Sequence, residues 1–169
     1  MTTIQTEKKE LVEKNIEKLN KQVDETMKKA FFDLLEQKVS SDPPDYEWLT
    51  ILYTEIRDKL TKLLKPTSKT RKHIEEKMDP EFFHQLISNN VFEYKSFYAL
   101  ICFVFEQCKE LGSPGRDEEV DQKLKEILDI YNSGNATFST LVPVFIKNAN
   151  HCIDNIYLDI QNLSELFKK

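Results

Sequence analysis

Few side chains in this sequence have a type and spacing that could do chemistry. Glu81 and His84 stand three residues apart, which places a carboxylate and an imidazole on one helix face, as in di-iron helix bundles. Such a site also needs a second Glu-x-x-His copy and two further glutamates, and the sequence has no second copy. The other histidines, His73 and His151, have no companion at ligand spacing. We therefore expect no metal site and no cofactor.

Nucleophilic catalysis is not indicated either. The sequence lacks a glycine-rich phosphate loop and a Gly-x-Ser-x-Gly motif. Its three cysteines, Cys102, Cys108 and Cys152, each lie within an apolar helical stripe, where burial keeps a thiol protonated and inert. A Cys–His pair could form only through the tertiary structure, and the stripes favour inert burial over such a pair. The sequence predicts a protein that is not an enzyme and has no catalytic residues.

Composition restricts the class of protein further. The 169 residues include only three glycines, and 40% are hydrophobic and 31% charged, which favours one globular helical domain over a sheet or a disordered chain. A net charge of −5 disfavours nucleic acid, which is bound by clustered Lys and Arg. No signal peptide and no apolar run of bilayer-spanning length is found. We expect a cytoplasmic protein without a transmembrane segment.

The helices that must position any functional residue are organised around one apolar run. Nine consecutive apolar residues extend from Phe97 to Phe105, and a helix that is apolar on all sides is buried. Gly112 ends this helix and is expected to take the left-handed conformation common after a helix. We predict an all-α fold, an irregular bundle of six or seven helices around a buried central helix at about 93–111.

A long first helix precedes this bundle. Apolar residues recur at steps of three and four from Val12 to Leu35, which predicts an amphipathic helix of about 30 residues. We expect it to pack from Val23 onward. The apolar residues of its N-terminal half are smaller and sparser, so 1–22 is interpreted as a mobile or partner-binding helix extension, including a coiled coil, of a single domain covering 1–169.

Two charged segments are candidate interaction sites. The first, a possible interaction site or structural clamp, comprises Arg116, Asp117, Glu118 and Glu119. Its three acids suit a helix N-terminus, whereas a cation there is unfavourable, so the guanidinium should reach a carboxylate or carbonyl elsewhere, as an internal clamp, or contact a partner. The second is a possible basic patch of Lys65, Lys69, Arg71 and Lys72. It is a solvated face or a patch for phosphate or an acidic partner.

Three blocks of the sequence resemble the T-complex protein 11 family. They are Val23–Leu35 with Pro43-Pro44-Asp45-Tyr46, Ile56–Pro66 with Ile74-Glu75-Glu76, and Pro114–Val120. The blocks cover about residues 23–130 in the family's order, and the resemblance fades after about Tyr131. The segment before Arg116 departs from the family's usual Cys-Ala-Pro and has Gly112-Ser113-Pro114. Because family domains continue beyond this length, the chain is interpreted as a short or truncated member.

The resemblance implies an all-helical, non-enzymatic protein linked to cyclic AMP and protein kinase A signalling and, in animals, to sperm function. We therefore expect an interaction or regulatory module that binds a protein partner. The sequence does not identify that partner or the oligomeric state. The alternative is a helical protein of the membrane surface that binds lipid. The eleven phenylalanines and the basic 65–73 segment favour it, and the negative net charge opposes it.

Overall fold

The computed structural model describes residues 3–89 and 93–167. Within these ranges all regular structure is helical, with seven α-helices, one short 3₁₀-helix and no strand, so the prediction of an all-α fold is confirmed. Contacts within the chain group into two units, residues 1–38 and 39–169. Each unit is described by itself.

The first unit is most of helix α1 (Thr3–Ser40). Every residue from Thr3 to Ala30 is exposed, and the first fully buried side chain is that of Leu35. Val23 is 48% exposed, and the packing of this helix from Val23 onward stays a prediction.

The second unit is a helical bundle whose helices begin with local capping signals. Asp45 accepts a hydrogen bond from the backbone N of Trp48 at 3.1 Å, and Asp79 accepts one from the N of Glu81 at 3.0 Å, with Pro80 in the first helical position. These contacts satisfy amide groups that a helix N-terminus leaves unpaired. The helices are α2 (Tyr46–Thr61), α3 (Lys69–Lys77), α4 (Pro80–Ser88), α5 (Tyr94–Leu111), η1 (Pro114–Arg116), α6 (Asp117–Asn132) and α7 (Phe138–Phe167).

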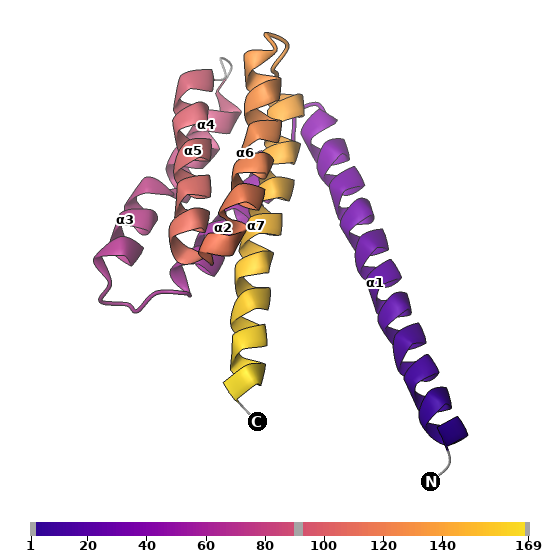
Figure 1. Cartoon of the computed structure of the whole chain (residues 1–169). Helices are drawn as coiled ribbons and strands as arrows, with labels where there is room; N and C mark the ends of the chain where they lie inside the picture. The colour runs from indigo at the N-terminus through magenta and orange to yellow at the C-terminus, as the bar shows by residue number, and fades with distance from the viewer. Residues whose placement is uncertain (1–2, 90–92, 168–169) are drawn as a thin grey trace. The chain divides into compact units, whose positions relative to one another are not determined.

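Helices α2 and α7 make the most extensive contacts in this bundle. Helix α7 packs against α2, α5 and α6, and α2 also packs against α3 and α4. Figure 1 shows α5, α6 and α7 next to one another. Fully buried aromatic pairs join these elements: Tyr53 of α2 stacks on Phe83 of α4 at 3.9 Å between ring centroids, and Phe97 of α5 meets Phe145 of α7 edge to face at 5.5 Å.

Helix α5 is buried on one side only. Phe97, Val104 and Phe105 are fully buried, whereas Tyr98 is 37% exposed and Phe103 is half-buried. The prediction that this helix is enclosed on all sides is therefore wrong. Its neighbours α6, α7 and α2 cover one side, and an apolar run does not require every member to be buried, because aromatic residues tolerate partial exposure.

Gly112 ends α5 for a different reason from the one expected. Its φ of −95° and ψ of −178° are extended, so the left-handed conformation expected there is wrong. A Cβ at this position would lie 2.8 Å from the carbonyl oxygen of Cys108 and 3.3 Å from Cγ1 of Ile156. Glycine is favoured because a Cβ would clash first with the last turn of α5 itself and also with the nearby side chain of α7.

Candidate functional site, a charged cluster between α6 and α7

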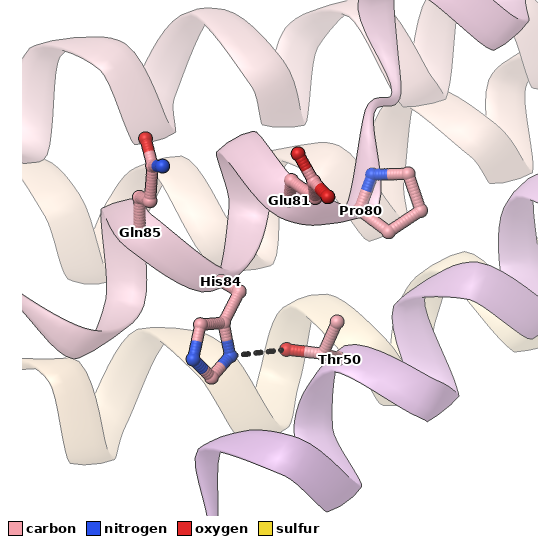
Figure 2. Close-up of a pocket in the computed structure, with 5 residues that line it drawn as sticks. All are labelled: Thr50, Pro80, Glu81, His84 and Gln85. Carbon is pink, nitrogen blue, oxygen red and sulfur yellow. Dashed lines mark hydrogen bonds between the residues drawn. The ribbon is translucent and has the colours of Figure 1, made fainter.

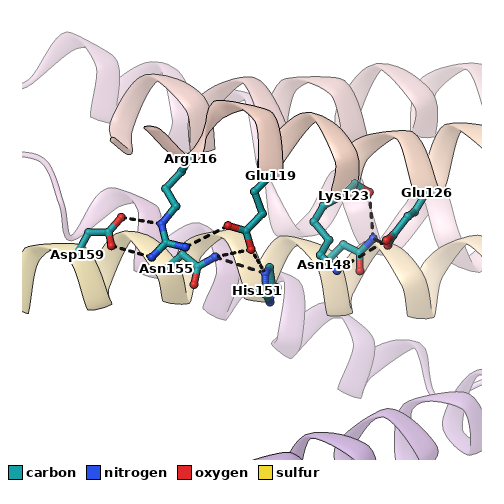
Figure 3. Close-up of polar contacts among 8 residues, drawn as sticks. All are labelled: Arg116, Glu119, Lys123, Glu126, Asn148, His151, Asn155 and Asp159. Atoms are coloured by element: carbon teal, nitrogen blue, oxygen red, sulfur yellow. Dashed lines mark hydrogen bonds and ion pairs between the residues drawn. The ribbon is translucent and has the colours of Figure 1, made fainter. Parts of the chain in front are cut away.

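The predicted site residue Arg116 lies where the 3₁₀ turn η1 passes into α6. Ser113 starts this turn by accepting a hydrogen bond from the backbone N of Gly115 at 3.4 Å. Arg116 is then the N-cap residue of α6 and makes no side-chain capping bond. Its guanidinium is directed away from the helix end, toward α7 (Figure 3).

The guanidinium binds two carboxylates. Its Nε and Nη2 donate to the two oxygens of Asp159 on α7, at 3.1 and 2.9 Å. The remaining nitrogen, Nη1, donates to Oε2 of Glu119 at 3.1 Å. The pair with Asp159 is bidentate, a geometry that matches the planar guanidinium and that lysine cannot reproduce. Arg116 thus links the start of α6 to α7 across 43 sequence positions.

Glu119 extends the cluster to two further residues of α7. Its other oxygen, Oε1, lies 2.7 Å from Nε2 of His151 and 3.3 Å from Nδ2 of Asn155. Because a carboxylate can only accept a hydrogen bond, Nε2 of His151 must be protonated and donates the hydrogen bond to Glu119. The 3.4 Å approach between Asn155 Nδ2 and His151 Nε2 then joins two donors, so it is a contact and not a hydrogen bond.

The cluster is charged at neutral pH. Hydrogen bonds from His151 and Arg116 lower the pKa of Glu119, and the hydrogen bond from Arg116 lowers the pKa of Asp159. The pKa of Arg116 is raised by its bonds to both carboxylates. The side chains are 26 to 38% exposed, so water screens them and the energetic gain is modest. The arrangement can fix the orientation of α6 against α7.

The other two residues of the predicted site lie outside this cluster. Glu118 is exposed, and Asp117 is half-buried with one carboxylate oxygen, Oδ1, buried without a hydrogen-bond partner. The contacts of Arg116 have the geometry of an internal clamp. Whether they serve stability or a partner stays a prediction, which substitution by lysine tests.

Sequence reasoning missed the residues of α7 that complete the cluster. His151, Asn155 and Asp159 follow one another at steps of four, which places them on one face of the helix. This row of polar residues at helical spacing was the available signal. Asn148 lies three residues earlier and is 2% exposed; its Nδ2 donates to the carbonyl of Lys123 at 3.0 Å and to Glu126 at 2.8 Å. Polar contacts therefore extend between α6 and α7 from Arg116 to Glu126 (Figure 3).

The residues of the predicted basic patch lie on and before α3. The guanidinium of Arg71 makes hydrogen bonds within the chain: it donates to the carboxylate of Glu75 at 3.0 Å and to the carbonyl of Leu64 at 3.2 Å. The other three residues are exposed lysines: Lys65, Lys69 and Lys72. A patch for phosphate or an acidic partner stays a prediction, and these lysines would have to carry it.

Glu81 and His84 line a hollow between α2 and α4 with Thr50, Pro80 and Gln85 (Figure 2). The hollow is open and has a volume of about 470 Å³. Thr50 donates its hydroxyl proton to the carbonyl of Tyr46 at 2.7 Å, so Nδ1 of His84, 3.2 Å from the same hydroxyl, must be the donor. The part of the chain that the structure describes contains no group of three or more His, Cys, Asp or Glu that could hold a metal ion.

The cysteines have the properties of core thiols. Burial raises the pKa of Cys108, and it raises that of Cys152 to about 12. Cys102 is half-buried, and its pKa is also raised. Such thiols are poor nucleophiles at neutral pH because almost none is ionised.

The described residues thus define an all-α helical bundle in which a charged cluster links α6 to α7. The T-complex protein 11 family model matches residues 7–164. The chain belongs to the T-complex protein 11 family. The match extends beyond the interval of about 23–130 inferred from the sequence blocks, so the conclusion that the resemblance fades after about Tyr131 is wrong.

Curated relatives support this membership. The chain is 34% identical to the T-complex protein 11 homolog of Rattus norvegicus, covering 86% of this chain and 25% of the relative. It is 32% identical to T-complex protein 11 of Mus musculus (89% and 26%) and 30% identical to the homolog of Homo sapiens (89% and 29%). The chain thus spans about a quarter of the length of these relatives.

No solved structure matches the chain. Within residues 3–89 and 93–167, no helix combines the length and the apolar composition that crossing a bilayer requires.

Proposed function

We propose that this chain is a non-enzymatic, cytoplasmic protein-interaction module that uses the C-terminal half of α7 to bind a helical segment of a partner protein. The observation that carries the proposal is an apolar stripe that passes from the core into solvent. Ile153 and Ile156 are buried, and the stripe continues with Ile160 (47% exposed), Leu163 (55%) and Phe167 (86%).

The spacing of this stripe favours a helix as the bound element. Its members follow one another at steps of three and four, the repeat with which one helix packs against another. An exposed apolar row of this kind is uncommon on a surface that faces only water. Leu158, also exposed at 46%, falls on the opposite face of the helix and does not belong to the stripe.

Membership of the T-complex protein 11 family supports the more specific proposal that the partner belongs to cyclic AMP and protein kinase A signalling. Purified regulatory and catalytic subunits of protein kinase A provide the direct probe. Calorimetric titration of either subunit into the full chain should give saturable binding. The absence of heat with both subunits would contradict this more specific proposal and leave the interaction stripe to be tested separately.

The interaction stripe is tested by two matched substitutions, Leu163→Asp in the stripe and Leu158→Asp on the opposite face. Both replace an exposed leucine of α7 by the same charge, so their effects on helix stability and net charge are alike. Proteins captured from extracts of cells that express the chain should be lost with Leu163→Asp and kept with Leu158→Asp. Equal capture by both variants would contradict the proposal.

Co-sedimentation with vesicles distinguishes the alternative, binding to a membrane surface. The proposal expects the full chain to remain in the supernatant with both neutral and anionic vesicles. Sedimentation with anionic vesicles that is abolished by charge reversal of Lys69 and Lys72 would instead favour the membrane surface, because anionic lipids attract clustered lysines.

A further inference from the structure

Helix α1 carries a second apolar stripe, and the described part of the first unit contains no other helix that covers it. From Thr3 to Ala30 the described helix has no half-buried or buried residue. Isolated helices gain most of their stability from packing of an apolar face, and without it they are marginal in water. The exposed fractions of the stripe residues are 57% for Val12, 53% for Ile16, 59% for Leu19 and 48% for Val23.

The stripe has the spacing of a coiled-coil seam. Val12, Ile16, Leu19 and Val23 follow one another at steps of four, three and four, which places Ile16 and Val23 at a positions and Val12 and Leu19 at d positions of a heptad. β-branched residues at a with leucine at d favour two strands; Ile16, Val23 and Leu19 fit this rule, and Val12 at the other d position does not. Lys9, at the preceding a position, ends the seam on one side, and Thr26, at the following d position, ends it on the other.

The residues that flank the seam are complementary to a parallel copy of themselves. In a parallel pair each g residue faces the e residue five positions later on the other helix. Lys8 at g then faces Glu13 at e, and Asn15 at g faces Asn20 at e. The first pair joins opposite charges and the second joins two amides that can exchange hydrogen bonds. Neither pair brings like charges together.

We infer that α1 forms a parallel two-stranded coiled coil with the α1 helix of a second copy of this chain, through the seam from Val12 to Val23. The occupant of this face is a second copy because the flanking pairs join opposite charges and matching amides when the same sequence is paired in parallel register. This surface is separate from the interaction stripe of α7. Its test therefore does not depend on the proposed function.

Sedimentation velocity of the full chain at rising concentration tests the inference. A seam of about two heptads predicts a weak dimer, whose dissociation constant should lie below the highest concentration measured, about 300 µM. Leu19→Glu should raise this constant by at least about 100-fold, because both copies lose a buried leucine and gain a charge in the seam.

Helix α1 contains its own matched control. Leu11 is 60% exposed against 59% for Leu19, and it occupies the c position outside the seam. Leu11→Glu should leave the dissociation constant unchanged within about twofold. Neither leucine is buried, so both variants should keep the helical circular dichroism of the bundle. A chain that stays monomeric at about 300 µM, or a dimer weakened equally by both substitutions, would overturn the inference.

Charge reversal tests the parallel direction. Lys8→Glu places a glutamate opposite Glu13 of the other helix, so both copies of this flanking pair then join like charges. The dissociation constant of the dimer should rise by roughly 2- to 10-fold. The double variant Lys8→Glu with Glu13→Lys restores opposite charges and should recover the original constant. A dimer that Lys8→Glu tightens, or that the double variant fails to restore, would overturn the parallel pairing.

Discussion

Two phenylalanines of α5 provide a quantitative test of how this helix is buried. Phe97 is fully buried and meets the ring of Phe145 edge to face at 5.5 Å. Phe103 is half-buried and meets the ring of His73 at 5.4 Å. Alanine at each position removes the same side chain from the same helix, so the helix propensity changes equally and the difference between the variants reports burial.

Phe97→Ala should lower the free energy of unfolding by about 3 to 5 kcal/mol, since truncation of a fully buried phenylalanine loses its transfer energy and leaves a cavity. The edge-to-face pair adds about 0.5 to 1.5 kcal/mol within that range. Phe103→Ala should cost only about 1 to 2 kcal/mol, because part of this ring already contacts water and little cavity remains.

Equilibrium unfolding in urea, followed by far-UV circular dichroism, measures both losses. The linear extrapolation applies if the slope with urea is the same in both variants and the parent. The reasoning is refuted if the two variants lose equal stability, because α5 would then be enclosed on both faces, as the apolar run alone suggested. A larger loss for Phe103→Ala would refute it as well.

Three further predictions concern the charged cluster and the thiols. Arg116→Lys keeps the charge but loses the bidentate pair with Asp159. If Arg116 is an internal clamp, the melting temperature of the variant should fall. If Arg116 contacts a partner, the melting temperature should stay the same and partner capture should weaken. The pKa values of Glu119 and Asp159 are lowered in the folded chain, so their contribution to stability is present above the ordinary carboxyl range. It should be lost below about pH 4, as urea unfolding at neutral and acid pH would measure. Cys102, which is half-buried, should react with a thiol reagent before the buried Cys152; faster labelling of Cys152 in the folded chain would contradict the assignment of an inert core thiol.

Local chemistry made the helices of this chain predictable from its sequence. Asp79 followed by Pro80 and Glu81 predicted the start of α4, and both the cap and the proline position are found. The nine-residue run predicted α5 by a different signal, because its length and apolar composition suit a buried helix. These signals act within one or two turns, so they need no knowledge of the rest of the chain.

Burial and the charged cluster depend on neighbours and could be predicted only in part. Tyr98 and Phe103 belong to the same run as Phe97, yet which face α5 buries is decided by where α6 and α7 pack. The unfavourable position of Arg116 at a helix start predicted a distant partner. Its identity, Asp159, depends on the register of α6 against α7, and sequence spacing alone does not define this register.

The most direct test of the proposed function compares the two matched leucine variants of α7 in one experiment. The parent chain, Leu163→Asp and Leu158→Asp are immobilised at equal density, and the captured proteins are identified and quantified by mass spectrometry. The account predicts one set of partners that Leu163→Asp loses and Leu158→Asp retains, because Leu163 lies within the exposed stripe and Leu158 lies opposite it. A set of partners retained equally by both variants, or lost equally by both, would contradict the claim that this stripe binds a partner.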